Sequence, residues 1–277
     1  MSFLRRYLRA RYGWLPLYEV RNKVRIGHTA IGLRRFEAAE ARRLAATFPD
    51  GRLPSALVAT ILLTYKRHDD LLKAVDSALN QTVTDHVVLV VDDGGGLPEL
   101  PAHPRLHSVS LSRNINVLGV SRNIGMRLTD SRFVAFLDDD NLWYPDHLET
   151  ALTALCRDEP QPAPDAVYTA MRRVFPDGRE LDVLSVPFDR TVAMNDTFLD
   201  CNCFVAKRSS AATFSRIRRS STVAPKEDWE LIYRLSRHHL IEHVPHVTVD
   251  YLVNPNSYWT HWETDGDSVG HSAPEAA

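Results

Sequence analysis

The sequence predicts an α/β protein with a mainly parallel sheet flanked by helices and a helical extension at the N-terminus. Three continuous apolar segments, at 56–63, 86–91 and 132–137, are typical of strands buried on both faces of a parallel sheet. Segments with helical spacing alternate with them, which favours right-handed crossovers. A chain of 277 residues, 44% hydrophobic and 25% charged, can bury a sizeable core, and this composition excludes fibrous and wholly disordered proteins.

The N-terminal arm, residues 1–54, is predicted to be a basic helical extension outside the main fold. Residues 1–43 contain 11 Lys/Arg and 3 Asp/Glu, a charge of +8. The rest of the chain contains 22 Lys/Arg and 32 Asp/Glu, a charge of −10. The alanine-rich segment 37–46 favours a helix, and the turn-forming residues of 48–54 mark a boundary.

The next elements follow in order up to residue 145, in the first half of the main domain. After the first strand, Asp69 or Asp70 is expected to cap a helix whose apolar residues recur every fourth position. We then expect a strand at 86–91, a short strand at 106–111, a helix at 119–129, a strand at 132–137 and a helix that opens at Pro145.

Residues 146–265 are expected to complete the same domain, which thus spans 55–265. The pattern there predicts a hairpin of 167–175 and 181–184, a strand at 198–206, a helix at 226–237 and a strand near 246–252. Residues 266–277 form a polar tail.

Two acidic clusters follow strongly predicted strands. Asp92 and Asp93 precede three glycines, and Asp138–Asp140 follow the third strand. Ligands of open α/β sheets bind beyond the carboxyl ends of the strands. Strand alternation would place Asp138 and Asp140 on one side, where their oxygens suit Mg²⁺ or Mn²⁺, while Asp93 could accept from a base or ribose. Acidic turns that cap helices remain the alternative for either cluster.

The combination of motifs, in this order and spacing, resembles the family 2 glycosyltransferases, which have the nucleotide-sugar-binding GT-A fold. The resemblance covers residues 56 to about 240. Its motifs are Thr64-Tyr65-Lys66-Arg67, Leu79-Asn80-Gln81-Thr82, Val91-Asp92-Asp93-Gly94, Ser121-Arg122-Asn123-Ile124-Gly125, Phe136 to Pro145, and Glu227-Asp228-Trp229-Glu230-Leu231.

The resemblance implies that residues 55–145 are the nucleotide-sugar-binding half of the domain and residues 146–265 the acceptor-binding half. It also implies a donor site and a metal site. Thr64, Tyr65 and Asp93 would hold the base and ribose, with Arg67 and Asp92 in the same donor set, and Arg122 would neutralise the diphosphate. Asp140 would be the direct metal ligand, and Asp138 or Asp139 would lie nearer the ribose, with Asp138 a second candidate ligand. The acid at the middle position and Asn141 depart from the usual motif, so the roles within 138–141 stay open.

The resemblance also implies a catalytic pair, Glu227 and Asp228. Adjacent helical residues diverge by about 100°, so only one can address an acceptor hydroxyl, and Asp228 is our candidate base. Some relatives place a late histidine near the metal, which makes His261 a further candidate ligand.

The implied enzyme is an inverting glycosyltransferase of glycan biosynthesis, dependent on Mn²⁺ or Mg²⁺. It would move a sugar from a nucleoside diphosphate sugar, with UDP as the expected nucleotide, to an acceptor hydroxyl. A sugar-1-phosphate nucleotidyltransferase is the alternative enzyme, although the loop after the first strand lacks the glycines expected of that class. A catalytically silent nucleotide- or glycan-binding module is the non-enzyme alternative.

The acceptor would be a glycan, a lipid-linked molecule or a small molecule, and no nucleic acid partner is expected. The arm interleaves aromatic and apolar residues with arginines, so we keep two interpretations of it: a buttress or homo-oligomer contact, and contact with a membrane surface. Three cysteines cannot all pair, and no secretory signal is evident, so we expect a cytoplasmic location, with membrane contact at the inner face as the peripheral variant.

Overall fold

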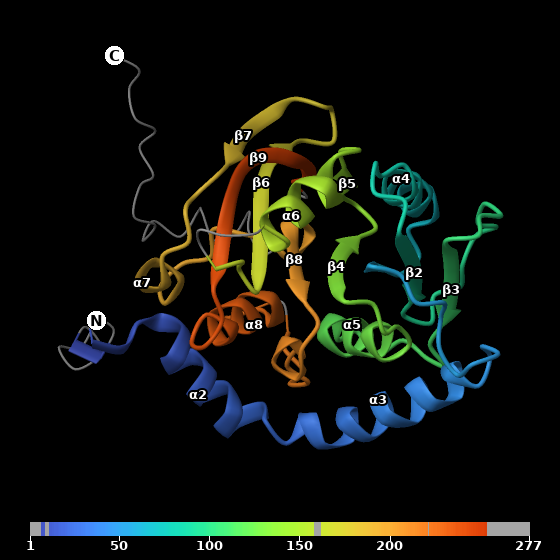
Figure 1. The fold of residues 1–277 in the computed structure, drawn as a ribbon. Helices are drawn as coiled ribbons and strands as arrows, with labels where there is room; N and C mark the ends of the chain where they lie inside the picture. Colours follow the sequence, from blue (N-terminus) through green and yellow to red (C-terminus); the bar gives the residue numbers. More distant parts are fainter. Residues whose placement is uncertain (1–6, 9–10, 158–161, 221, 254–277) are drawn as a thin grey trace, which may run out of the picture.

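The computed structural model describes residues 7–8, 11–157, 162–220 and 222–253. Their strands form one sheet, with helices on both sides of it (Figure 1). The strands are β1 (Val58–Thr64), β2 (His86–Asp92), β3 (Leu106–Ser110), β4 (Phe133–Asp138), β5 (Leu142–Trp143), β6 (Ala166–Val174), β7 (Glu180–Leu184), β8 (Phe204–Lys207) and β9 (Ile241–Leu252). The order across the sheet is β3-β2-β1-β4-β8-β6-β9-β5, and β7 pairs with β6.

The first half of the sheet is parallel, as predicted, and it brings the acidic clusters to one edge. Every residue of β1 and β2 is buried, which explains their uninterrupted apolar sequences. The register pairs Thr64 with Asp92, and Leu63 with Asp138. The carboxyl ends of β2, β1 and β4 therefore lie side by side.

Helices α4 (His68–Leu79), α5 (Leu118–Arg127) and α6 (His147–Leu155) follow these strands. The expected cap of α4 is wrong: the helix begins at His68, so Asp69 and Asp70 lie in its first turn, where the helix dipole still favours acids. Gly125 lets α5 lie close to the sheet, because a Cβ there would be 2.6 Å from Cγ2 of Ile61.

The second half of the sheet is mixed. β6 and β7 form the predicted antiparallel hairpin, β8 runs antiparallel between β4 and β6, and β9 pairs in parallel with β6. The strand predicted for 198–206 is wrong in its first part, because residues 201–203 form a short 3₁₀ helix, η1 (Cys201–Cys203), and the strand starts only at Phe204. The other helices in this half of the chain are α7 (Arg190–Ala193), η2 (Ser210–Ala212) and α8 (Glu227–Leu235).

The described part of the N-terminal arm includes the helices α2 (Trp14–Ile26) and α3 (Thr29–Ala45), which run along one side of the molecule (Figure 1). Its side chains contact the rest of the chain closely. The fully buried Glu37 carboxylate accepts from Arg216 Nε and Nη2, both at 2.7 Å, and from Asn123 Nδ2 at 3.0 Å. The arm is therefore packed as a buttress against α5 and the segment before α8. No helix within the described ranges is both long and apolar enough to cross a bilayer.

Candidate active site

A cavity of about 420 Å³ opens at the carboxyl edge of the parallel strands. Its walls come from the ends of β1, β2 and β4, the loop after β3, and the start of α5. Seven of the residues predicted to bind donor or metal line it: Thr64, Tyr65, Arg67, Asp93, Asp138, Asp139 and Asp140. Asn114, Asn116, Leu118, Ser121, Leu63 and Val91 complete the lining.

Asp139 connects the β4 turn to the end of β1. Its Oδ2 accepts from Thr64 Oγ1 at 2.7 Å and from the Tyr65 amide at 3.3 Å, and its Oδ1 accepts from Arg67 at 3.2 Å. Burial raises the pKa of Asp139 to about 6, against the opposing effects of the Thr64 hydrogen bond and the Arg67 charge.

Asp140 shares Arg67 with Asp139, and its other oxygen accepts from Asn141 Nδ2 at 2.9 Å. Burial and then the Asp138 charge raise the pKa of Asp140. β4 ends at Asp138, so Asp139 and Asp140 lie in a turn. Strand alternation therefore does not govern their directions.

Arg122 connects Asp138, which lines the cavity, with Glu227, one of the two candidate catalytic acids. This side chain is 2% exposed, and its Nη2 donates to both Asp138 oxygens at 2.8 and 3.1 Å, while its Nη1 donates to Glu227 Oε1 at 3.0 Å. Burial opposes its charge, but nearby carboxylates, Asp138 foremost, outweigh burial and raise its pKa. Gly119 permits this arrangement, because a Cβ there would lie 2.8 Å from the Ser215 carbonyl oxygen and 3.3 Å from Glu227 Cγ.

Asp228 and Glu227 begin α8 and have different partners. Glu227 pairs with Arg122, whereas an Asp228 oxygen accepts a local bond, from the amide of Trp229 at 2.7 Å. Burial, followed by the charges of Glu227 and Asp200, raises the pKa of Asp228 to about 7. A carboxyl with this pKa can exchange a proton near neutral pH.

Asp92 and Asp93 both support loops next to the cavity. Asp92 accepts from the amides of Gly95 at 2.8 Å and Gly96 at 3.0 Å and does not line the cavity. Asp93 does line it, and its carboxylate accepts from Asn114 Nδ2, the Ile115 amide and the Asn116 amide at 2.8 to 3.1 Å. Asp93 thus holds the loop that forms one wall.

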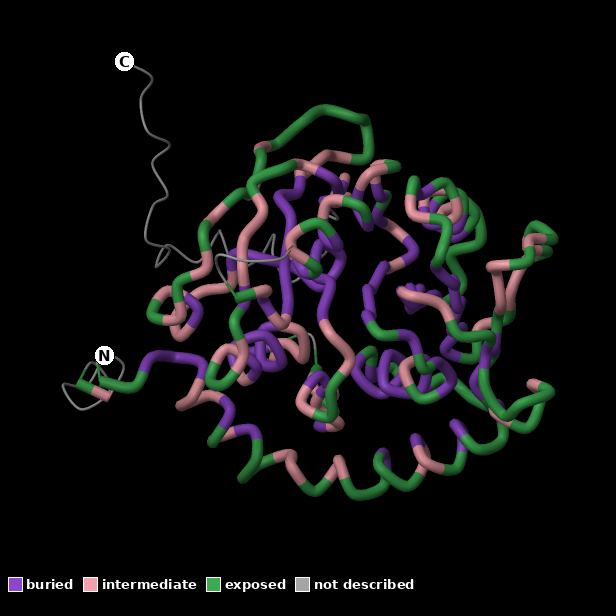
Figure 2. Tube along the Cα trace, viewed as in Figure 1, coloured by how far each residue is buried: buried purple, intermediate pink, exposed green. Residues whose placement is uncertain are grey.

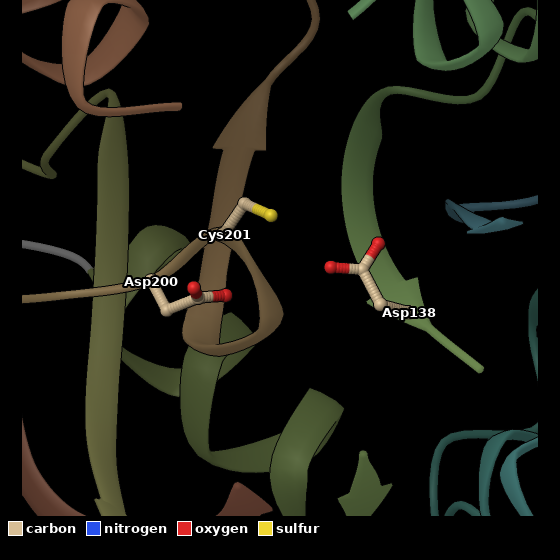
Figure 3. A group of neighbouring side chains, drawn as sticks. All are labelled: Asp138, Asp200 and Cys201. Carbon is tan, nitrogen blue, oxygen red and sulfur yellow. The ribbon is translucent and has the colours of Figure 1, made fainter. Parts of the chain in front are cut away.

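The sequence interpretation missed a polar group at η1. Asp200 and Cys201 converge on Asp138, with one potential ligand atom of each within 4.8 Å of the others (Figure 3). Asn202 joins the acids: its Oδ1 accepts from the Asp138 amide at 2.6 Å, and its Nδ2 donates to Asp200 at 2.6 Å. Burial and then Asp138 raise the pKa of Asp200 to about 6. The signal was the run of polar residues inside an expected strand.

The carboxylates of Asp138, Asp139 and Asp140 at the β4 turn fit a hard divalent cation. Asp138, Asp139 and Asp140 line one cavity, and the pKa of both Asp139 and Asp140 is raised by carboxylate neighbours in addition to burial. A cation would relieve this repulsion, and oxygen ligands suit Mg²⁺ or Mn²⁺. The group at η1 fits less well, because Cys201 offers a thiol of raised pKa. His261, the third candidate ligand, lies outside the described residues.

Sequence comparisons identify relatives for the central part of the chain. The model of the family described as "Glycosyl transferase family 2" matches residues 60–214. The succinoglycan biosynthesis protein ExoW of Rhizobium meliloti is 35% identical over 111 residues, which are 37% of this chain and 35% of that protein. The chondroitin synthase of Escherichia coli is 32% identical over 129 residues, which are 44% of this chain and 18% of the synthase. The matches thus span a minor part of each relative.

Solved structures share the fold. Staphylococcus aureus TarS 1–349 in complex with UDP-GlcNAc superposes with a TM-score of 0.55 at 14% identity, over 73% of this chain and 60% of that one. The mannosyltransferase PcManGT of Pyrobaculum calidifontis, in complex with GDP-Man and Mn²⁺, gives a TM-score of 0.53 at 16% identity, over 84% and 70%. At these identities the likeness establishes the GT-A fold.

Proposed function

The chain belongs to glycosyl transferase family 2, and from this premise we propose that it transfers a sugar from a nucleoside diphosphate sugar to an acceptor hydroxyl. We further propose UDP as the nucleotide. The UDP-GlcNAc complex of TarS and the GDP-Man complex of PcManGT support a nucleotide-sugar donor. Family membership favours sugar transfer over nucleotidyl transfer or a silent binding module.

The observation that carries the proposal is the position of Arg122. Its single buried guanidinium bonds Asp138, at the wall of the cavity, and Glu227, at the start of the helix that carries the candidate base. This contact brings together Asp138 and Glu227, about 90 residues apart in the chain, and so supports a single site for donor binding and catalysis. A permanently charged, planar group at this junction suits the diphosphate of a donor.

We propose that the enzyme is metal-dependent, with Asp138 and Asp140 as the ligands. Both carboxylates line the cavity, and both are held by arginines, Asp138 by Arg122 and Asp140 by Arg67. A bound Mg²⁺ or Mn²⁺ would supply positive charge that stabilises the departing diphosphate. Arg67 and Arg122 would then be released from these acids and could pair with phosphate oxygens.

Asp228 is the proposed general base. The Arg122 pair occupies Glu227, so Asp228 is the acid of the two that can accept a proton from an acceptor hydroxyl. With its proton removed, that oxygen forms the new bond to the anomeric carbon as the bond to the diphosphate breaks. Because attack and departure take place on opposite faces of the sugar, the anomeric configuration inverts. Removing the carboxylate base should slow this step by about 10²- to 10⁴-fold.

The test is a thermal-shift panel of UDP, GDP, dTDP and CDP, each with Mn²⁺, with Mg²⁺ and with chelator. A ligand that binds only the folded state raises the melting temperature, so we expect the largest rise with UDP and metal. An equal rise with chelator would contradict the metal, and a larger rise with another nucleotide would contradict UDP. If no nucleotide shifts the melting temperature, the nucleotide-sugar donor itself is wrong.

A further inference from the structure

In the N-terminal arm, the acidic side chains of the two helices lie on the inner side and the exposed basic side chains on the outer side. The three acids of α2 and α3, Glu19, Glu37 and Glu40, are all buried and face the rest of the protein. Within 11–46 every exposed charged side chain is basic, and these are Arg11, Lys23, Arg25, Arg34, Arg35, Arg42 and Arg43. Figure 2 shows the same division along α2 and α3, exposed on the side turned away from the sheet and buried toward it. We call this exposed side the outer face.

The outer face also carries apolar side chains. Val20 is 63% exposed, Val24 is 80% exposed and Ile31 is 61% exposed. Val20 and Val24 are four residues apart on α2, so they project from the same side of the helix, and Lys23 and Arg25 lie next to them. A helix that places aliphatic side chains beside lysines and arginines is suited to a surface that is anionic and apolar just beneath.

We propose that the outer face of α2 and α3 binds the surface of a bilayer containing anionic lipids. The cations would contact the headgroups, and Val20, Val24 and Ile31 would enter the boundary between headgroups and acyl chains. The inward contacts of the arm, such as the pairs of Glu37 with Arg216 and Glu19 with Arg219, hold the face in place before it binds. Binding therefore needs no ordering of these helices.

Charge and shape distinguish this occupant from two others. A second copy of the chain, docked through the same face, would place its cations against identical cations. A nucleic acid would neutralise the charge, but exposed Val and Ile give its bases no aromatic platform for stacking. Of these three occupants, the lipid surface alone would contact both the cations and the exposed aliphatic side chains of the outer face.

The test is co-sedimentation of the full chain with vesicles of phosphatidylcholine alone and of equimolar phosphatidylcholine and phosphatidylglycerol. We expect binding to the anionic vesicles only, weakened by added salt. The triple variant Lys23→Glu, Arg25→Glu, Arg35→Glu should bind at least about tenfold more weakly. The control Arg179→Glu reverses an exposed charge at the turn between β6 and β7 and should bind like the wild type. Unchanged binding of the triple variant, or equal binding to both vesicles, overturns the proposal.

A second pair of measurements separates insertion from simple charge attraction. Val20→Ser with Val24→Ser should weaken binding to anionic vesicles several-fold and leave retention on an anionic polymer column unchanged. If vesicle binding is unaffected, the apolar part of the proposal is wrong. Tighter binding to duplex DNA than to anionic vesicles at the same salt would assign the face to nucleic acid instead. Each variant is used only if its thermal melting matches that of the wild type, and Lys23→Gln with Arg25→Gln replaces the triple variant if it does not.

Discussion

At the residue scale, the neighbouring acids Glu227 and Asp228 have different bonding partners, and this difference bears on which of them is the base. The sequence places them side by side at a helix start, and helical geometry alone leaves open which one is the base. The ion pair of Glu227 with the buried Arg122 distinguishes their surroundings, since the bond of the Asp228 carboxylate within the described structure comes from the Trp229 amide. This difference supports Asp228 as the proposed base.

The pH dependence of the reaction should report the protonation of Asp228. Its pKa is raised to about 7, first by burial and then by Glu227 and Asp200, and a general base works only in its deprotonated form. We therefore expect kcat to fall about tenfold per pH unit below about pH 7 and to level off above it, in a steady-state profile with saturating donor. Asp228→Asn should lose this activity and retain the UDP-dependent thermal shift. A profile without this fall, or loss of UDP binding in the variant, would remove Asp228 from the role.

Ser121 is predicted to contact the donor. Its side chain is 1% exposed, its hydroxyl has no hydrogen-bond partner within the described structure, and it lines the cavity. A buried hydroxyl without a partner is expected to find one when a ligand binds, which is worth about 1 kcal/mol. Ser121→Ala should therefore weaken UDP binding about fivefold in calorimetric titration.

Ser131 supplies the matched control for this prediction. Its hydroxyl is also buried and without a partner among the described residues, but it does not line the cavity. Ser131→Ala should leave UDP affinity unchanged. Equal affinities of the two variants would mean that the Ser121 hydroxyl does not meet the ligand.

At the scale of elements, sequence predicted what depends on local pattern and missed what depends on tertiary contact. The strands at 58–64 and 86–92 were predictable because complete burial requires unbroken apolar runs. The 3₁₀ turn at Cys201–Cys203 was not, because apolar residues flank it as they would in a strand. Asn202 bonds Asp200 locally and accepts from the Asp138 amide, and this second, long-range bond brings Asp200 next to Asp138. The position of the acids at the strand ends was therefore predictable, whereas that of Asp200 was missed.

The arm shows the same limit of prediction from local sequence, and a substitution of Glu37 tests how firmly α3 is attached. Composition predicted helix α3, but not that Glu37 would be fully buried between Arg216 and Arg127 from other elements. Removing one partner of a buried ion pair costs about 3–5 kcal/mol, because the other charge is left unpaired. Glu37→Ala should lower the free energy of unfolding by about this amount in urea titration, whereas the exposed Glu99→Ala should change it by less than about 0.5 kcal/mol. A similar small effect for both would mean that α3 is only loosely attached.

At the scale of the whole molecule, the charge split of the sequence has a structural meaning. The arm is positive overall, yet two of its acids, Glu19 and Glu37, bind arginines of the rest of the chain, and every exposed charged side chain within 11–46 is basic. The negative remainder includes the acids that line the cavity and begin α8. The family model matches from residue 60, so the arm lies outside the matched part while it is packed into the same core.

Deletion of residues 1–46 should therefore destabilise the entire protein. The deletion would expose apolar surface now covered by Leu33 and Leu44, and it would leave Arg216 and Arg219, both largely buried, without their carboxylates. Two such losses amount to about 6 kcal/mol or more, and each kcal/mol lowers the melting temperature of a protein of this size by roughly 2–4 °C. We expect calorimetry of the truncated chain to show a melting temperature at least about 10 °C lower. An unchanged melting temperature would show that the arm is an appended segment, and its helices would then have to be treated as a separate unit.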